Sequence, residues 1–475
     1  EATMRNFVIA GAGEVGRGIA QALIYERKNV ILVDPNPDAL KQASTLECLL
    51  ISGDILTDKA MDLVGILNCE MFIAVTDSDE RNILACTFAK RVFEMRGGNT
   101  GSMVAIARVN RMPLFREMDS SDYTDWTGID HIANADKVIV EELTAGLVSP
   151  QILHTVPMGN GTLICVSRVA EGSNLIGGPL LQNADAIDGL PPPIGIVGSG
   201  SRSSIVNETT EAEMGDLLLF AATGSHVQTR ITSACGFVSK PMVDHPRVII
   251  FGATPVGKDL AQHYLAKDSN VTVVEPDLIS ANDLVGSEAG NHRRLDVIHG
   301  EPDDVELLKD IGIANHDIAI STMDDDNGAI AIAMRAVDEG IERAGLIVDD
   351  STLVDTVRRI GLTRAVSRRE VTVGAVLEHV HSYVEGRFQI IRHAKEFVAM
   401  TVMMSEGHKY TGWSLDKVQG KLKSDAKIVA LERVVPDRGL ITFPPDGEMV
   451  LEVEDRIVIV GLRDSIQQVE AKLRS

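Results

Sequence analysis

Aromatic residues and long apolar runs are both scarce in this chain. Only 4% of its 475 residues are aromatic, and no apolar run approaches the ~20 residues that a membrane-spanning helix needs. The start of the sequence also lacks the basic segment followed by an apolar one that marks a secretory signal. We therefore expect a globular protein of the cytosol, whose length predicts roughly three domains or four small ones.

Cysteines and basic residues are also too few for several classes of protein. Five widely spaced cysteines without a CxxC pair exclude a disulfide framework and a structural zinc site. A net charge of −23 without a basic stripe argues against nucleic-acid binding. A single nucleotide is still compatible with this charge, because amides at the start of a helix attract phosphate locally. We expect all five cysteines to be small buried hydrophobic residues, at Cys48, Cys69, Cys86, Cys165 and Cys235.

Catalytic patterns are missing as well. None of the five tyrosines is followed four residues later by a lysine, which removes a common proton relay of dehydrogenases. The acidic run 324–326 fits a solvated helix cap better than a metal site, so we predict no metal ligands. Isolated histidines, for which we expect surface or capping roles, occur at His154, His226, His393 and His408.

The first segment of the chain has the pattern of a dinucleotide-binding strand, turn and helix. An apolar run at 7–10 leads into Gly-Ala-Gly-Glu-Val-Gly at 11–16, before an amphipathic helix. Gly11 tightens such a turn, Gly13 lets the backbone approach a pyrophosphate, and Gly16 lets the helix pack on the strand. A second run, 30–33, ends in Asp34, where a Rossmann fold places the acid that binds ribose hydroxyls. Its charge disfavours a 2′-phosphate, so the motif favours NAD(H).

Polar residues follow the next three apolar runs of this first copy. In a parallel sheet the carboxyl ends of the strands meet at one edge, where ligands bind. Each Gly-Asp or Thr-Asp pair alone is better explained by helix capping, but the set together with Asp34 favours a ligand site. Arg108 has two interpretations, a phosphate contact and a structural ion pair. The residues at these strand ends are Gly53, Asp54, Thr76, Asp77 and Arg108.

A second copy of the unit begins 241 residues after the first. Its turn retains Gly252 and Gly257, and Glu275 replaces the ribose-binding Asp. Thr254 stands at the middle glycine and adds bulk where phosphate must approach, so we expect weaker or altered nucleotide binding. Further along, Glu301 takes the position of Asp54, and Asp349 is expected at that of Arg108. Gly300 and Thr322 belong to the equivalent strand ends.

The two copies alternate with two shorter, β-rich stretches that resemble each other. The predicted fold is α/β: two Rossmann-like, doubly wound parallel sheets, each followed by a small α+β lobe. We expect the domains at 4–148, 149–240, 241–385 and 386–475. Three prolines at 191–193, together with the Gly/Ser stretch 195–204, are expected to form a surface loop. Helices near 138–147 and 371–384 are candidates for crossover packing against a neighbouring unit, although their apolar residues also suit an ordinary core.

This series of motifs resembles the family of Trk-type potassium uptake protein A, whose units are called regulators of conductance of potassium (RCK). The resemblance covers nearly the entire chain, and its markers include the 11–16 turn, the Ser-Gly-Asp step at 52–54, and Asn82 after the Thr-Asp pair. It implies a peripheral cytoplasmic subunit without catalytic activity that binds NAD(H) or ATP/ADP. It further implies a ring, expected to be a homotetramer, that regulates an integral-membrane potassium transporter and lies on the inner face of the plasma membrane through that partner.

Two other functions use the same opening motif and stay open: an NAD-dependent dehydrogenase, and a nucleotide-sensing scaffold without a membrane partner. The residues predicted to contact the nucleotide are Gly11, Gly13, Glu14, Val15, Gly16, Asp34, Gly53, Asp54, Thr76, Asp77, Asn82, Arg108, Gly252, Gly257, Glu275, Gly300, Glu301 and Thr322.

Overall fold

Four sheets organise the chain in a computed structural model. It describes residues 5–110, 120–159, 161–198, 203–238, 240–360, 362, 364–381, 388–423, 425–436 and 438–473. The chain divides into two compact units, residues 1–136 with 369–382, and residues 137–368 with 383–475. Within the described ranges, no helix combines the length and apolar character needed to span a membrane.

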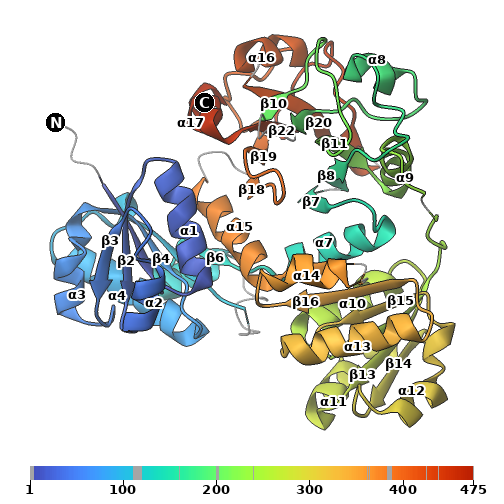
Figure 1. The fold of residues 1–475 in the computed structure, drawn as a ribbon. Coiled ribbons are helices and arrows are strands. Elements are labelled where there is room, and N and C mark those ends of the chain that lie inside the picture. Colours follow the sequence, from blue (N-terminus) through green and yellow to red (C-terminus); the bar gives the residue numbers. More distant parts are fainter. Residues whose placement is uncertain are drawn as a thin grey trace. The chain divides into compact units, whose positions relative to one another are not determined.

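The first sheet has six parallel strands in the order β3-β2-β1-β4-β5-β6 (Figure 1). Strand β1 pairs with β2 on one side and with β4 on the other, so the strand order reverses between β1 and β4, the point at which such sheets bind ligands. The strands are β1 (Asn6–Ala10), β2 (Asn29–Asp34), β3 (Leu49–Ser52), β4 (Cys69–Ala74), β5 (Val104–Arg108) and β6 (His131–Ala133). The helices are α1 (Glu14–Tyr25), α2 (Pro37–Gln42), α3 (Asp58–Leu63), α4 (Asp79–Met95) and α6 (Ser120–Thr127), with 3₁₀ turns η1 (Ile66–Asn68) and η2 (Thr100–Ser102).

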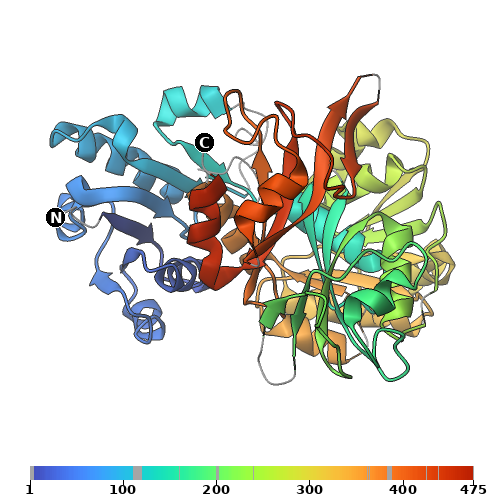
Figure 2. The ribbon, with the colours of Figure 1, turned by 90° about the horizontal axis from the view of Figure 1, so that it is seen from above.

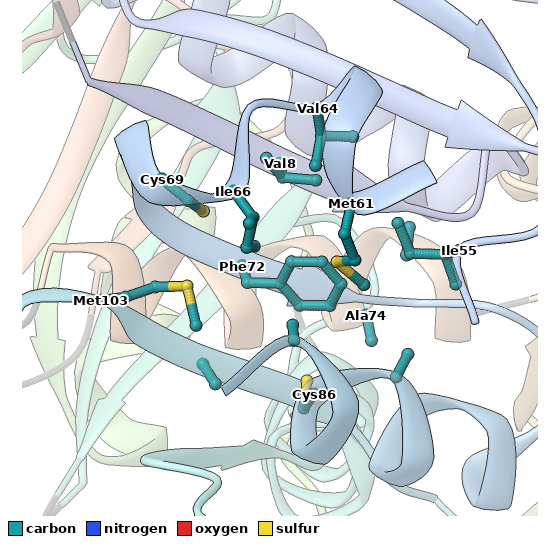
Figure 3. Close-up of a cluster of buried hydrophobic side chains, with 14 of the residues drawn as sticks. Val8, Ile55, Met61, Val64, Ile66, Cys69, Phe72, Ala74, Cys86 and Met103 are labelled. Carbon is teal, nitrogen blue, oxygen red and sulfur yellow. The ribbon is translucent and has the colours of Figure 1, made fainter. Parts of the chain in front are cut away.

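One face of this sheet packs against α3 and α4 to form an apolar core. Phe72 of β4 is fully buried among Met61 of α3 and Cys86 of α4 (Figure 3). Burial raises the pKa of the Cys69 thiol to about 12, as expected for a cysteine that acts as a hydrophobic residue. The prediction of buried cysteines is confirmed for four of the five. It is wrong for Cys48, which is half-buried because it lies in the turn before β3.

The second parallel sheet repeats the same order, β14-β13-β12-β15-β16-β17. The predicted fold class is thus confirmed, and each sheet has a short sixth strand beyond the five expected. The strands are β12 (Arg247–Phe251), β13 (Asn270–Glu275), β14 (Leu295–His299), β15 (Ile318–Ser321), β16 (Arg343–Val348) and β17 (Arg364–Ser367). The helices are α10 (Pro255–Leu265), α11 (Leu278–Gly286), α12 (Val305–Ile311), α13 (Asp326–Asp338), α14 (Leu353–Arg359) and α15 (Arg368–Val380), with η3 (Ala289–Asn291) and η4 (Ile313–Asn315).

The two smaller lobes are antiparallel sheets in the order β10-β9-β11-β8-β7 and β18-β19-β22-β20-β21. The first contains β7 (His154–Gly159), β8 (Thr162–Arg168), β9 (Gly195–Val197), β10 (Ser203–Ile205), β11 (Leu217–Thr223), α8 (Leu180–Asp185) and α9 (Ser225–Ala234). The second contains β18 (Phe388–Ile390), β19 (Phe397–Met403), β20 (Ala426–Val435), β21 (Gly439–Phe443), β22 (Arg456–Leu462), α16 (Leu415–Leu422) and α17 (Ile466–Leu473), with η5 (Arg463–Ser465).

The two antiparallel sheets share one apolar core within the second unit, where the red strands lie beside the teal ones (Figure 2). Phe397 of β19, for example, packs within 2.7 Å of the position that a Cβ on Gly195 would take. The loop predicted over 191–193 and 195–204 is therefore wrong at 195–197 and 203–204, which pair as parts of β9 and β10. The sequence hid these strands because each is only three residues long.

Two helices each follow one parallel sheet in the sequence but pack with the lobe of the other parallel sheet. Helix α15 follows the second parallel sheet but belongs to the first unit beside α1 (Figure 1). Its Val373 packs against Gly18 of α1. Conversely, α7 (Asp136–Val148) follows the first sheet, and its Leu143 and Leu147 pack against Gly345 of β16. The exchange takes place within one chain.

Candidate functional site

The first glycine turn follows β1 at the point where the strand order reverses. Gly11 has φ +114°, a conformation that favours glycine, and its N–H donates to the carbonyl of Val33 at 2.9 Å. A Cβ on Gly16 would lie 1.8 Å from the Gly11 carbonyl oxygen. Gly13 is different: its φ is −64°, no side chain caps α1 there, and a Cβ would meet no atom within 4 Å. The space beside Gly13 is therefore open.

Asp34 braces this turn. Its Oδ2 accepts from the backbone N–H of Ala12 at 2.7 Å, and its Oδ1 accepts from that of Asn36 at 2.8 Å. Gly53 donates its N–H to the carbonyl of Asp34 at 3.2 Å. The carboxylate thus ties the ends of β1 and β2 together, and each oxygen keeps a second lone pair with which to accept another hydrogen bond.

Asn82 connects the ends of β4 and β5. Its Oδ1 accepts from both the N–H and the hydroxyl of Thr76 at 2.7 Å, and its Nδ2 donates to the carbonyls of Thr76 and Arg108 at 3.0 Å. The side chain is fully buried. Asn82 therefore positions Thr76 and Arg108, and its direct contact with a nucleotide stays a prediction.

Charged groups surround the same edge of the sheet. Asp54 Oδ1 forms an ion pair with Nη2 of Arg81 at 2.5 Å. With the Asn110 amide oxygen turned toward it, the Arg108 guanidinium donates to that oxygen from Nε at 2.8 Å and from Nη2 at 2.9 Å. Asp77 is exposed. Arg81 was missed by the sequence analysis, although a cation in the first turn of a helix opposes the helix dipole and was a usable signal.

The second glycine turn has the same backbone frame. Gly252 has φ +102°, and its N–H donates to the carbonyl of Val274 at 2.9 Å. Glu275 replaces Asp34: its Oε2 accepts from the N–H of Ala253 at 2.5 Å and its Oε1 from that of Asp277 at 2.8 Å. The N–H of Gly300 donates to the Glu275 carbonyl at 3.1 Å, as Gly53 does to Asp34.

The space above the second turn is occupied by the protein's own side chains. The hydroxyl of Thr254 accepts from the N–H of Gly257 at 3.1 Å and donates to the hydroxyl of Thr322 at 2.9 Å. Thr322 in turn donates to the carbonyl of Gly252 at 3.0 Å. Pro255 is the first residue of α10 and has no N–H. Two amides that a phosphate would use at a helix start are therefore bound or absent.

The register of the strands shows that, contrary to the prediction, Asp349 of the second copy does not occupy the position of Arg108 in the first. Ala107 pairs with Ala74 in the first sheet, and Leu346 pairs with Ser321 in the second. Arg108 therefore corresponds to Ile347, and Asp349 corresponds to Asn110. The backbone agrees, since the N–H of Asn110 donates to Asp79 and that of Asp349 to Asp326. The prediction for Asp349 was wrong because the strand ends are offset by two residues in the sequence.

Register confirms the other predicted equivalence. Asp34 pairs with Ser52, and Glu275 pairs with His299, so Glu301 occupies the position of Asp54. Glu301 is exposed. Gly328 occupies the position of Arg81, because both lie three residues after the N-cap of their helices, Asp325 and Ser78. At the carboxyl edge of the second parallel sheet, the positions equivalent to Arg81 and Arg108 are therefore occupied by uncharged residues.

The crossover helix α15 reaches the first turn. Arg369, in its first turn, forms an ion pair with Glu14 of α1 at 2.7 Å between Nη1 and Oε2. Glu14 directly follows Gly13, so this ion pair links the open space of the first turn to the start of α15. Farther along α15, His381 lies 3.3 Å from Glu26.

Two histidines expected at the surface are buried. His154 lies 3.3 Å from Glu142, and Nε2 of His408 is 2.9 Å from the carbonyl of Leu473. Both lie in the small lobes and are 8% and 6% exposed, respectively. Across the part of the chain that the structure describes, no group of three or more His, Cys, Asp or Glu side chains is arranged to hold a metal ion.

Comparison with known proteins finds the same architecture. The TrkA-N domain matches residues 7–118 and 248–368. Trk system potassium uptake protein TrkA from Azorhizobium caulinodans is 27% identical over 474 residues, 98% of each chain. The protein of the same name from Vibrio alginolyticus is 25% identical over 455 residues, 95% of this chain and 93% of that one. The resemblance predicted from the sequence is confirmed.

Solved structures with this fold include the GsuK RCK domain. It aligns with a TM-score of 0.52 and 17% identity, covering 100% of this chain and 96% of that one. The GsuK channel bound to NAD aligns with a TM-score of 0.52 and 17% identity, over 99% of this chain and 80% of that one. At this identity the likeness establishes the fold alone.

Proposed function

We propose that this chain, a protein with two TrkA-N domains that resembles Trk system potassium uptake protein TrkA over nearly its whole length, regulates a membrane potassium transporter. In this proposal it binds an adenine nucleotide, NAD(H) or ATP/ADP, and has no catalytic activity of its own. It assembles into a ring, a homotetramer with eight Rossmann-like lobes, two from each chain. It contacts the membrane only through the transporter.

The open first turn is the observation that carries the nucleotide part of the proposal. Gly13 leaves space for a pyrophosphate above the start of α1, where amides and the helix dipole favour an anion. Asp34 keeps lone pairs for ribose hydroxyls at the edge of that space. A related fold, the GsuK channel, is known with NAD bound. Arg81 and Arg108 supply cations for phosphate groups beyond the pyrophosphate.

The Arg369–Glu14 ion pair supports a route from nucleotide to conformational change. A ligand in the first turn lies next to Glu14 and alters the field felt by its partner at the start of α15. Ligands that differ in phosphate charge then favour different positions of this helix, and each shifts the equilibrium only by its difference in affinity between the two states. ATP and NADH would thereby produce different potassium flux.

Reconstitution with the transporter tests the proposal directly. The purified chain is mixed with the potassium transporter in proteoliposomes, and potassium flux is measured with NADH, with ATP and without nucleotide. Flux is expected to depend on the nucleotide with the wild-type chain and to lose that dependence with Gly13→Val. If no transporter binds and flux ignores every adenine nucleotide, the regulatory proposal is wrong, and turnover of keto acids with NADH should be measured instead.

A charge variant separates binding from regulation. Arg369→Gln removes the ion pair with Glu14 but leaves the glycine turn intact, so NADH should bind with unchanged affinity while the flux response falls. Arg96→Gln is a matched control, because Arg96 pairs with Asp58 and Asp62 in the same unit away from the turn. A full flux response in Arg369→Gln would exclude this route.

A further inference from the structure

A small cavity in the second unit is lined by an unusual concentration of cationic groups. Its volume is about 20 Å³, room for roughly one water molecule or one monatomic ion. Three guanidinium groups line it, from Arg358 of α14, Arg364 of β17 and Arg392 after β18. Glu142 of α7 and Asp355 of α14 are the two lining carboxylates. The lining therefore has one positive charge in excess, in a chain whose net charge is −23.

Arg364 is the most deeply placed of the three cations. Its side chain is 6% exposed, and its Nη2 is 3.5 Å from Glu142 Oε1, too far for a good hydrogen bond. Nη2 and Nε have no hydrogen-bond partner among the described residues. Nε lies over Gly146 of α7, whereas Nη1 donates to the carbonyl of Leu153 at 3.2 Å. A buried guanidinium with unsatisfied N–H groups is costly unless an acceptor lies beside it.

The neighbouring guanidinium of Arg358 cannot act as an acceptor for Arg364, and its own donors are bonded elsewhere. Arg358 is committed to the carbonyls of Pro150, Ile152 and Leu153 at 2.8–3.0 Å. Burial, together with the charge of Arg364, lowers the pKa of Arg358 to about 10, a sign of crowded positive charge.

Two imidazoles complete the lining without adding charge near neutral pH. Burial first, and then the neighbouring His154 and Arg392, lower the pKa of His393 to about 4. Burial is also the main cause that lowers the pKa of His154. Both rings are therefore uncharged at neutral pH, and they leave the excess positive charge to the guanidinium groups.

We propose that this cavity binds a single monatomic anion, with chloride as the natural occupant. Room for about one water-sized occupant favours a monatomic anion over phosphate or a carboxylate. An anion beside Arg364 would satisfy its N–H groups and balance the lining charge. The lining comes from α7, β7, α14, β17 and the segment after β18, so the anion would join the second parallel lobe to both antiparallel lobes. This inference is independent of the proposed regulatory function.

Halide-dependent stability tests the site in the full chain. Thermal unfolding is followed in sodium chloride, sodium bromide and sodium gluconate at equal ionic strength. The halides should raise the unfolding midpoint by about 2–4 °C over gluconate. Arg392→Gln neutralises the lining excess and should abolish that rise. Glu142→Gln adds to the excess and should enlarge the rise, even if the variant is less stable in gluconate.

A surface control and a direct observation complete the test. Arg294→Gln breaks an ion pair with Asp268 outside the cavity and should leave the halide effect unchanged. Crystals soaked in bromide should give an anomalous peak beside Arg364. Equal midpoints in all three salts, or a bromide-free cavity, would mean that it holds water only and would overturn the proposal, as would halide effects of the same size in Glu142→Gln and Arg392→Gln.

Discussion

The two glycine turns have the same backbone and opposite accessibility. In both, a glycine at positive φ begins the turn, and an acid ties the turn to the next strand. The first leaves the space beside Gly13 open, whereas the second closes it with Thr254, Thr322 and Pro255. A Rossmann-like turn can therefore keep its backbone structure after side chains fill the position at which a phosphate would bind. The fold alone does not identify a binding site.

The largest effect is expected from residues that both turns share. Gly16→Ala and Gly257→Ala each place a Cβ within about 2 Å of a carbonyl oxygen, at 1.8 Å from Gly11 and 2.1 Å from Gly252. Each should lower the free energy of unfolding by about 3 kcal/mol, measured by urea denaturation. Equal losses would establish that the frame is the same in both lobes, and a neutral Gly257→Ala would break the comparison.

Gly13→Val should separate binding from folding. The residue has φ −64° and open space around its Cβ, so valine fits the empty turn but occupies the position of a pyrophosphate. We expect NADH affinity to fall about 100-fold, or about 2.7 kcal/mol, with an unchanged unfolding midpoint. Calorimetric titration measures the affinity. Wild-type affinity in this variant would remove the first turn from the account.

Removing the side chains that fill the second glycine turn should strengthen NADH binding at the second lobe. The double substitution Thr254→Gly with Pro255→Glu restores the space and the N–H groups present in the first turn. We expect NADH binding at the second lobe to strengthen about tenfold, or about 1.4 kcal/mol, when it is measured in a Gly13→Val background. If affinity does not rise, features beyond the turn, such as the missing equivalents of Arg81 and Arg108, limit the second site.

The smallest effect is expected from Thr254→Val. Valine has nearly the shape of threonine but cannot cap α10, so about 1 kcal/mol of stability should be lost. NADH affinity should stay at the wild-type value, because the second turn is already closed. This variant is the matched control for Gly13→Val, and a clear loss of NADH affinity would contradict the assignment of the main site to the first lobe.

Sequence patterns predicted the fold well because long apolar runs and repeated motifs specify parallel sheets. They failed where local signals are short, as at β9 and β10, or where register decides equivalence, as for Asp349 and Arg108. The second turn shows a different limit. Thr254 was recognised as bulky, but its bond to Thr322 joins residues 68 positions apart, which a local pattern cannot reveal. Pro255 was readable in the sequence and was overlooked.

Interactions of the crossover helices were beyond sequence reasoning as well. The apolar segments near 138–147 and 371–384 suggested crossing helices, and α7 and α15 do cross, although 382–384 lie outside the described residues. Their polar anchors, Arg369 with Glu14 and His381 with Glu26, join positions 355 residues apart. Such pairs depend on three-dimensional proximity and leave no local signature.

The stoichiometry of NADH binding tests the central claim most directly. Isothermal titration calorimetry of the purified wild-type chain counts the sites per chain and compares their affinities. The account predicts one NADH per chain at the concentrations that fill the first turn, with any second event at least about 100-fold weaker, or about 2.7 kcal/mol. Two equal, independent sites per chain would contradict it, because the filled second turn could not then exclude a pyrophosphate.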